Sequence, residues 1–302
     1  MIVRDKPGAW QLLFAVRGSV LPRIAPQLLF IVACATAVVA VDKLLLPLTH
    51  SDATPFAVIG VALSLFLGFR NNAAYDRWWE ARKLWGGLLA DIRSFAREAE
   101  VFIADKPMRQ ALLRQLLAFI HLHRANLRRL PTDALAHAHA EAAAPAAGLT
   151  NAPHPPCASL NLLNTTLADA HRAGRIDSVG ALAISERLAA LTLQQAGCER
   201  IANTPLPYVY SLLVFRTIYI YCLLLPLALI DQSGWMTPLF VGIVAYTFFG
   251  LAEVTEELAH PFGQTVNALP LDAICRAAEI SLAPHLDQPA PPALLPAGFT
   301  LN

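Results

Sequence analysis

The fold of this chain is decided by residues 60–82, which read GVALSLFLGFRNNAAYDRWWEAR. The first half of this stretch is apolar, and the second half is charged and contains Trp78 and Trp79. Proline, which would end or kink a helix, is absent from it. The stretch therefore predicts an apolar helix that runs without a break into a charged one.

Two stripes run along the apolar half of this predicted helix, because residues four apart share a helix face. The first consists of small residues: Gly60, Ser64 and Gly68. The second lies about 100° round the helix and is apolar: Val61, Leu65 and Phe69. Small residues let helices approach closely in lipid, so a ring of such helices would turn the apolar stripe to a central axis as a hydrophobic pore constriction. An ordinary buried helix of a membrane bundle fits the same pattern, and both interpretations remain open at this point.

The composition is that of an integral membrane protein. Of the 302 residues, 56% are hydrophobic and 15% are charged, and the mean hydropathy is +0.47. The net charge of +1 gives no basic field for nucleic acid, so no nucleic-acid partner is predicted. The five cysteines form no CxxC pair, and motifs such as Gly-x-Ser-x-Gly and His-Glu-x-x-His are absent. We therefore predict no enzyme, no cofactor and no metal site.

Four apolar segments predict four transmembrane helices, at residues 26–41, 55–69, 208–230 and 236–252. A full span needs about 20 residues, so the shorter segments must draw on their flanks. Basic residues cluster before the first segment and after the second: Arg4, Lys6, Arg17, Arg23, and then Arg70, Arg77, Arg82, Lys83. The positive-inside rule then places both termini and the long middle region in the cytoplasm.

The middle region is too long for a loop and must fold. Helical spacing covers residues 84–104, 108–130 and 177–203, whereas residues 134–156, with alanine-histidine repeats and three prolines, predict a flexible or irregular connection. A Pro-rich tail is expected to be extended or disordered. The predicted organisation is residues 1–80 with the first two spans, 81–205 as a cytosolic helical region, 206–256 with the last two spans, 257–283 after the membrane, and 284–302 as a flexible tail.

Polar side chains within the predicted helices have simple expected roles. His121 and His123 lie two apart on different helix faces, so we expect surface histidines rather than metal ligands, and the same for His137 and His139. Arg216 lies inside the third span, where a charge is costly. Two roles remain open for it: a place near an ion path, or a structural one, either paired with a carboxylate (Glu253 or Glu256) or snorkelling to the interface.

Three blocks of the sequence resemble the bestrophins in their bacterial form. Residues 66–82, FLGFRNNAAYDRWWEAR, are similar to the signature of their second helix. Residues 197–207, GCERIANTPLP, resemble the entry to their third membrane helix. Residues 257–263, ELAHPFG, followed by LPLD at 269–272, resemble the segment after the fourth. The three blocks occur in the family's order, and the resemblance spans nearly the whole chain apart from the Pro-rich tail and residues 134–156.

The resemblance implies a homopentameric ion channel in the bacterial inner membrane. Each subunit would be an all-α membrane protein with four transmembrane helices and a large helical cytosolic region around the central pore. The family's narrow neck would correspond to Val61, Leu65 and Phe69, and its lower cytosolic aperture to Val179. The implied partners are further copies of this chain, the lipid bilayer and small monovalent ions.

One departure from the family concerns calcium. Animal bestrophins bind Ca²⁺ through an acidic run after the Pro-Phe-Gly, but this chain has QTVNA at residues 264–268, and Asp272 is the only acidic residue nearby. Ca²⁺ takes six to eight oxygen ligands, so we expect no calcium gating through this segment. The sequence leaves the sign of the ion open: anions follow the family, and cations remain possible. A membrane transporter or a membrane-embedded scaffold without channel activity is the alternative, although no internal repeat of the kind typical of transporters is present.

Overall fold

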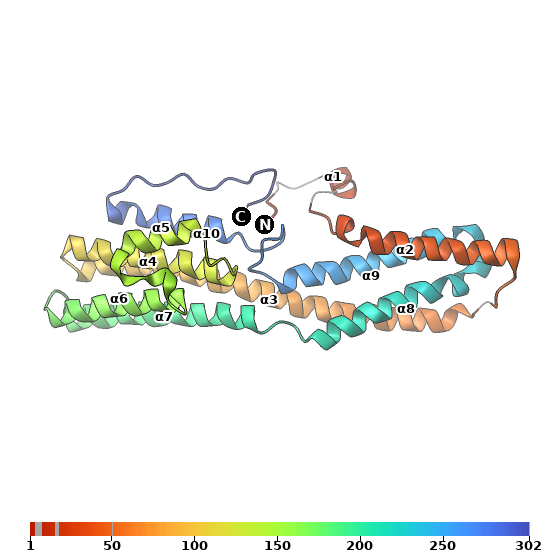
Figure 1. Cartoon of the computed structure of the whole chain (residues 1–302), viewed down its shortest axis with the longest axis horizontal. Helices are drawn as coiled ribbons and strands as arrows, with labels where there is room; N and C mark the ends of the chain where they lie inside the picture. The colour runs from red at the N-terminus through yellow and green to blue at the C-terminus, as the bar shows by residue number, and fades with distance from the viewer. Residues whose placement is uncertain (4–7, 16–17, 50, 302) are drawn as a thin grey trace. The chain divides into compact units, whose positions relative to one another are not determined.

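A computed structural model describes residues 1–3, 8–15, 18–49 and 51–301 of the chain (Figure 1). Over these residues the regular structure is helical, and β-structure is limited to two isolated bridges that Thr300 makes with Ile2 and Ala297. This confirms the predicted all-α class. The chain divides into two compact units. We call Arg4–Trp78 with Pro205–His260 the apolar unit, and Met1–Val3, Trp79–Thr204 and Pro261–Asn302 the polar unit.

A single helix, α3 (Ala53–Phe102), contains the whole of the stretch 60–82. The prediction of an unbroken apolar-to-charged helix is therefore confirmed. Residues 53–78 of α3 belong to the apolar unit, and residues 79–102 belong to the polar unit.

The apolar unit contains further helical elements. These are α1 (Ala9–Leu13), α2 (Leu21–Ala40) with its π-helical continuation Val41–Leu45, α8 (Tyr208–Ser233), the 3₁₀ turn Gly234–Met236 and α9 (Thr237–Ala259). Proline lies in the first turn of α2 and α9, where its missing N–H costs no hydrogen bond. Three helical stretches in the described part of the chain are long and apolar enough to cross a membrane: Leu21–Leu45, Ala53–Phe102 and Tyr208–Ala259. The last of them is formed by α8 and α9 together.

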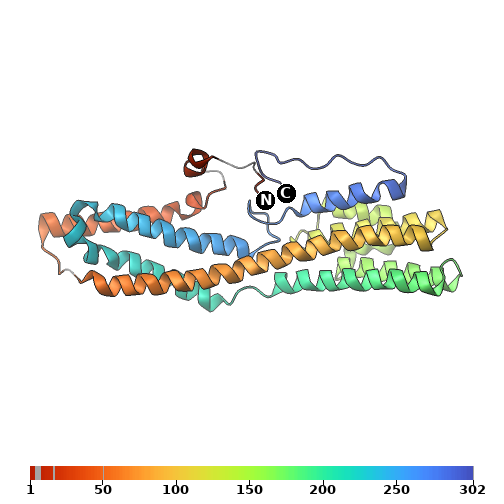
Figure 2. The same ribbon diagram turned by 180° about the vertical axis from the view of Figure 1, so that it is seen from behind.

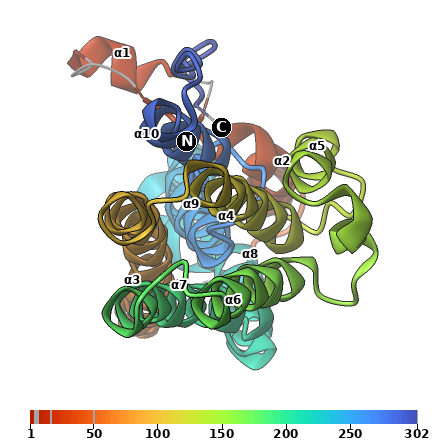
Figure 3. The same cartoon turned by 90° about the vertical axis from the view of Figure 1, so that its left-hand side faces the viewer.

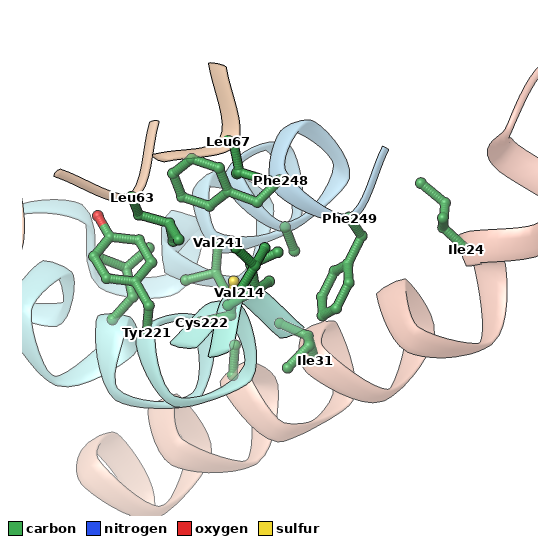
Figure 4. Packing of buried hydrophobic residues seen from close by; sticks show 14 residues of the cluster. Ile24, Ile31, Leu63, Leu67, Val214, Tyr221, Cys222, Val241, Phe248 and Phe249 are labelled. Atoms are coloured by element: carbon green, nitrogen blue, oxygen red, sulfur yellow. The ribbon is translucent and has the colours of Figure 1, made fainter. Parts of the chain in front are cut away.

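One apolar core holds these helices together, with α2 packed against α8 and α9 (Figure 4). Leu63 and Leu67 of α3 enter this core and are at most 3% exposed. Tyr221 of α8 meets Phe248 of α9 edge to face, with ring centroids 5.6 Å apart. The face of α3 that packs within the chain therefore differs from the apolar stripe.

Ion pairs connect the polar ends of the same helices. Arg23 of α2 pairs with Glu253 of α9 at 3.0 Å, and Arg70 of α3 pairs with Glu256 at 2.9 Å. Arg216 is exposed and forms no ion pair with any residue that the structure describes. The predicted pairing of Arg216 with one of these glutamates is therefore wrong, because Glu253 is paired with Arg23 and Glu256 is paired with Arg70. The snorkelling and ion-path interpretations of Arg216 remain.

The polar unit is a helical bundle in which α4 lies at the centre, packed against α5, α6 and α10 (Figure 3). Its helices are α4 (Lys106–Leu127), α5 (Ala134–Ala143), α6 (Pro155–Arg172), α7 (Ser178–Asn203) and α10 (Leu271–Leu282). Short 3₁₀ turns lie at Pro145–Ala147, Leu149–Asn151 and Pro284–Leu286. An aspartate caps the N-terminus of three of these helices by accepting a backbone N–H: Asp105, Asp133 and Asp177.

Residues 79–102 of α3 run beside α7 in this bundle (Figure 2). Glycines allow the close approach, since a Cβ at Gly87 would lie 2.6 Å from Nε2 of Gln194 and one at Gly197 would lie 2.8 Å from Leu84. The predicted helices at 108–130 and 177–203 are confirmed to within a few residues at their ends, and the one predicted at 84–104 is the last part of α3, which ends at Phe102.

Two predictions for the polar unit are wrong. The connection at 134–156 contains the helix α5, because Asp133 caps an alanine-rich segment of high helix propensity, and irregular structure is limited to the residues around 144–154. His121 and His123 are fully buried instead of lying on the surface. Most faces of α4 are covered by neighbouring helices in this part of the bundle, so different faces do not mean different exposure. After Pro284–Leu286 the tail continues without a regular helix, as predicted for an extended segment.

Candidate functional site

The apolar stripe of α3 is uncovered in the single chain. Val61 is 70% exposed, Leu65 57% and Phe69 61%. The interpretation of these three residues as an ordinary buried helix face is therefore wrong within one chain. Exposing a contiguous apolar patch to water is unfavourable, so lipid, another protein chain or a dewetted space must adjoin it. No charged residue occurs between residues 53 and 69, so the stripe presents no ring of charge.

The small stripe has two different environments. A Cβ on Gly60 would lie 2.7 Å from the hydroxyl of Tyr221, so Gly60 permits close packing of α3 on α8 inside the chain. Ser64 donates its hydroxyl to the carbonyl of Gly60 at 2.8 Å and is exposed. Around Gly68, by contrast, none of the described residues would come within 4 Å of an added Cβ. The open end of this stripe is thus available to a neighbouring helix.

An open apolar groove of about 550 Å³ lies beside the stripe, between α3 and α8. Phe66 and Phe69 line it from α3, and Tyr210 and Leu213 line it from α8. At its polar end the guanidinium of Arg70 is nearly buried and donates to Ser211 at 2.8 Å and to Glu256 at 2.9 Å. The charge of Arg70 is therefore neutralised and fixed in place, and the groove itself remains apolar.

Val179 lies in the first turn of α7 in the polar unit and is 66% exposed. Asp177 caps this turn by accepting the N–H of Gly180 at 2.7 Å. Gly180 packs tightly, since a Cβ there would lie 2.6 Å from Phe102. The turn is therefore fixed, and it holds the Val179 side chain toward solvent.

Asp272, the acidic residue after the Pro-Phe-Gly, is already paired with arginines. Asp272 accepts hydrogen bonds from Arg124 at 2.8 Å and from Arg128 at 2.7 Å, one on each carboxylate oxygen. The small polar cavity beside it, of about 200 Å³, is lined by Gln264 and Thr265 but also by Arg128. A cation would have to displace arginines from the one carboxylate that lines it.

Comparison with known proteins identifies the chain. A sequence profile of bacterial and fungal bestrophin proteins matches residues 1–284. The chain belongs to the bestrophin family. A voltage-dependent anion channel-forming protein of Mesorhizobium japonicum is 48% identical over 298 residues, which are 98% of this chain and 96% of that protein. One of the same name from Escherichia coli is 38% identical over 299 residues, 97% of this chain and 96% of that one. The crystal structure of a bestrophin homologue from Klebsiella pneumoniae superimposes with a TM-score of 0.79 at 31% identity, over 88% of this chain and 99% of that one.

The bestrophin assignment confirms the resemblance that the three sequence blocks indicated, and it makes this chain an integral membrane protein. Of the predicted site residues, the structure brings Val61, Leu65 and Phe69 onto one exposed face of α3 and places Val179 on an exposed turn of α7. Sequence reasoning missed the groove between α3 and α8, because its two walls lie more than a hundred residues apart in the chain.

Proposed function

We propose that this bestrophin is one subunit of a homopentameric channel that passes small monovalent anions through an apolar neck. The neck is formed by the stripe on α3: Val61, Leu65 and Phe69. The observation that carries the proposal is the exposure of these three side chains in a chain whose α3 buries another face. Relatives named as voltage-dependent anion channel-forming proteins support anions as the permeating ions.

In the proposed arrangement α2, the apolar half of α3, α8 and α9 each cross the bacterial inner membrane once. The basic residues around Arg23 and Arg70 then lie on the cytoplasmic side, together with both termini and the polar unit. The membrane part comprises residues 1–80 and 206–256. Residues 257–283 follow it as the segment after the membrane, and residues 284–302 form the tail. Because α8 and α9 are joined by a short turn, they cross as an antiparallel pair.

The neck would oppose the passage of ions because it cannot replace their hydration water, and it would not distinguish ions by charge. Three stacked apolar rings offer no ligand to replace the water around an ion, and a narrow apolar ring dewets. The sign of the permeating ion must then be set elsewhere along the path, and Val179 is the proposed lining of a second constriction in the cytosolic part.

Measurement of the reversal potential in a salt gradient tests the function directly. Purified protein in a planar bilayer with unequal KCl on the two sides is expected to give a reversal potential close to the chloride equilibrium potential. A potential close to that of potassium would replace the anion proposal with a cation channel. Flux into liposomes that saturates with ion concentration, without unitary currents in the bilayer, would favour a carrier.

A further inference from the structure

Three helices of the polar unit bring two histidines and a glutamate together. His121 comes from α4, His139 from α5 and Glu279 from α10. Nε2 of His121 lies 2.9 Å, and Nε2 of His139 lies 3.5 Å, from Oε1 of Glu279. The two imidazole rings are nearly parallel with centroids 4.0 Å apart, and one ligand atom from each of the three residues lies within 4.8 Å of the others. Potential ligand atoms from three side chains thus lie close together.

His121 has an incomplete set of partners. It is completely buried, its Nδ1 has no hydrogen-bond partner among the described residues, and its Nε2 lies 2.9 Å from Oε1 of Glu279. Its contact with Glu279 has the distance of a hydrogen bond but not the direction. Buried polar atoms are normally satisfied, so an imidazole with an unsatisfied nitrogen, beside a second histidine and a carboxylate, requires an explanation.

The distances agree with those between the ligands of a tetrahedral ion. Zinc bonds of about 2.0–2.1 Å place neighbouring ligand atoms about 3.3 Å apart. The two nitrogen-to-oxygen distances of 2.9 Å and 3.5 Å lie on either side of that value. In the stacked arrangement the nitrogen lone pairs lie in separate planes, so one ring must rotate for both nitrogens to face a common centre.

The arginines that face this cluster are already neutralised. Arg276 lies 2.7 Å from Oε2 of Glu279, which leaves Oε1 directed at the histidines. Arg124 of α4, the other nearby cation, is paired with Asp133 at 2.5 Å and with Asp272 at 2.8 Å. An arginine held against the second oxygen of a ligating carboxylate is a common way to orient such a ligand.

We propose that His121, His139 and Glu279 bind one divalent transition-metal ion, with Zn²⁺ as the best match. Two imidazoles and one carboxylate are ligands that zinc prefers, and three protein ligands leave a fourth position for water. His139 is partly exposed and provides the route of entry. The ion would join α4 and α5, which are neighbours in the sequence, to α10, which lies far from both.

Metal titration of the full-length protein in detergent tests this proposal, whatever its oligomeric state. Protein stripped with EDTA is titrated with ZnCl₂, and the bound metal is counted after gel filtration. We expect one Zn²⁺ per chain, and a higher midpoint of thermal unfolding when it is bound. His139→Gln and Glu279→Gln should each weaken binding at least tenfold. His137→Gln is the matched control, because His137 lies on the same helix and contacts the carbonyl of Pro131 instead.

A Co²⁺ titration gives an independent readout, since a tetrahedral site with nitrogen and oxygen ligands produces a strong visible absorption that an exposed six-coordinate ion does not. Wild type and His137→Gln should show it, and His139→Gln and Glu279→Gln should not. The proposal is overturned if wild type binds no Zn²⁺ beyond the amount held by His139→Gln, or if both glutamine variants keep wild-type affinity. Because His139 is partly exposed, His139→Gln is expected to fold. If His139→Gln does not fold, Glu279→Gln tests the same site independently.

Discussion

Asp272 decides what the segment after α9 can bind, because both of its carboxylate oxygens are occupied by buried arginines. We predict that micromolar Ca²⁺ on the cytosolic side leaves the channel current unchanged. Asp272→Ala should instead destabilise the polar unit by about 1–3 kcal/mol, since it leaves Arg124 and Arg128 partly uncompensated. Bilayer recordings over a calcium series and thermal unfolding of the variant check the two statements. Steep calcium activation that Asp272→Ala abolishes would contradict this interpretation.

The individual cysteines outside the membrane also differ from one another in expected reactivity. Burial raises the pKa of the Cys198 and Cys275 thiols, and both side chains are fully enclosed. Cys157 near the start of α6 is exposed. Because the thiolate is the reactive form, a maleimide should label Cys157 in the folded protein, and should label Cys198 and Cys275 only after denaturation. Peptide mass spectrometry after a short labelling pulse distinguishes the sites. Equal labelling of all three in the folded protein would show that the polar unit opens locally.

Individual side chains also mark the limit of what the sequence could predict. That Val61 and Leu65 share one face of α3 follows from local spacing on one helix, which a sequence displays directly. The burial of His121 depends on α5 and α10, whose packing against α4 is a tertiary contact that local sequence does not display. The metal cluster has no motif spacing, since each of its helices contributes one residue, and no pattern in the chain could have indicated it.

At the scale of elements, α3 was predictable because 23 consecutive residues contain no proline and keep one helical pattern. The helix α5 was not, because a segment of alternating alanine and histidine also fits low-complexity sequence. Asp133 was the missed signal: an aspartate directly before an alanine-rich run is an N-cap, and it accepts the N–H of Ala136 at 2.8 Å.

The neck prediction also belongs to α3. Replacing Val61, Leu65 and Phe69 together by alanine removes apolar bulk while keeping helix propensity. If the three rings form the restriction, the current should rise, by about tenfold for each 1.4 kcal/mol removed from the barrier. Single-channel recording measures this, and Phe69→Ala alone should give part of the increase. Equal or lower current in an intact triple variant would show that these side chains do not line the restriction.

The control for that experiment must be an exposed side chain elsewhere. Leu63 is unsuitable although it is also on α3, because it is 3% exposed and its truncation would create a cavity that costs about 2–5 kcal/mol. Leu29 of α2 is 70% exposed, so Leu29→Ala should leave both folding and current unchanged.

For the whole molecule, the two ends of the small stripe have different predicted roles: one in the folding of a single chain and the other in the assembly of subunits. Gly60 packs on Tyr221 within the chain, whereas Gly68 faces open space that a second subunit would fill. We predict that the wild-type protein in detergent is a pentamer and that Gly68→Leu weakens the pentamer without unfolding the chain, because the neighbouring backbone can no longer approach. Native mass spectrometry reports the assembly, and circular dichroism reports the helix content. Ala37→Leu adds the same kind of bulk at an exposed position of α2 and should leave the pentamer intact. A wild-type protein that is only monomeric or dimeric, or a Gly68→Leu variant that assembles as stably as wild type, would place the contact between subunits on another face of α3.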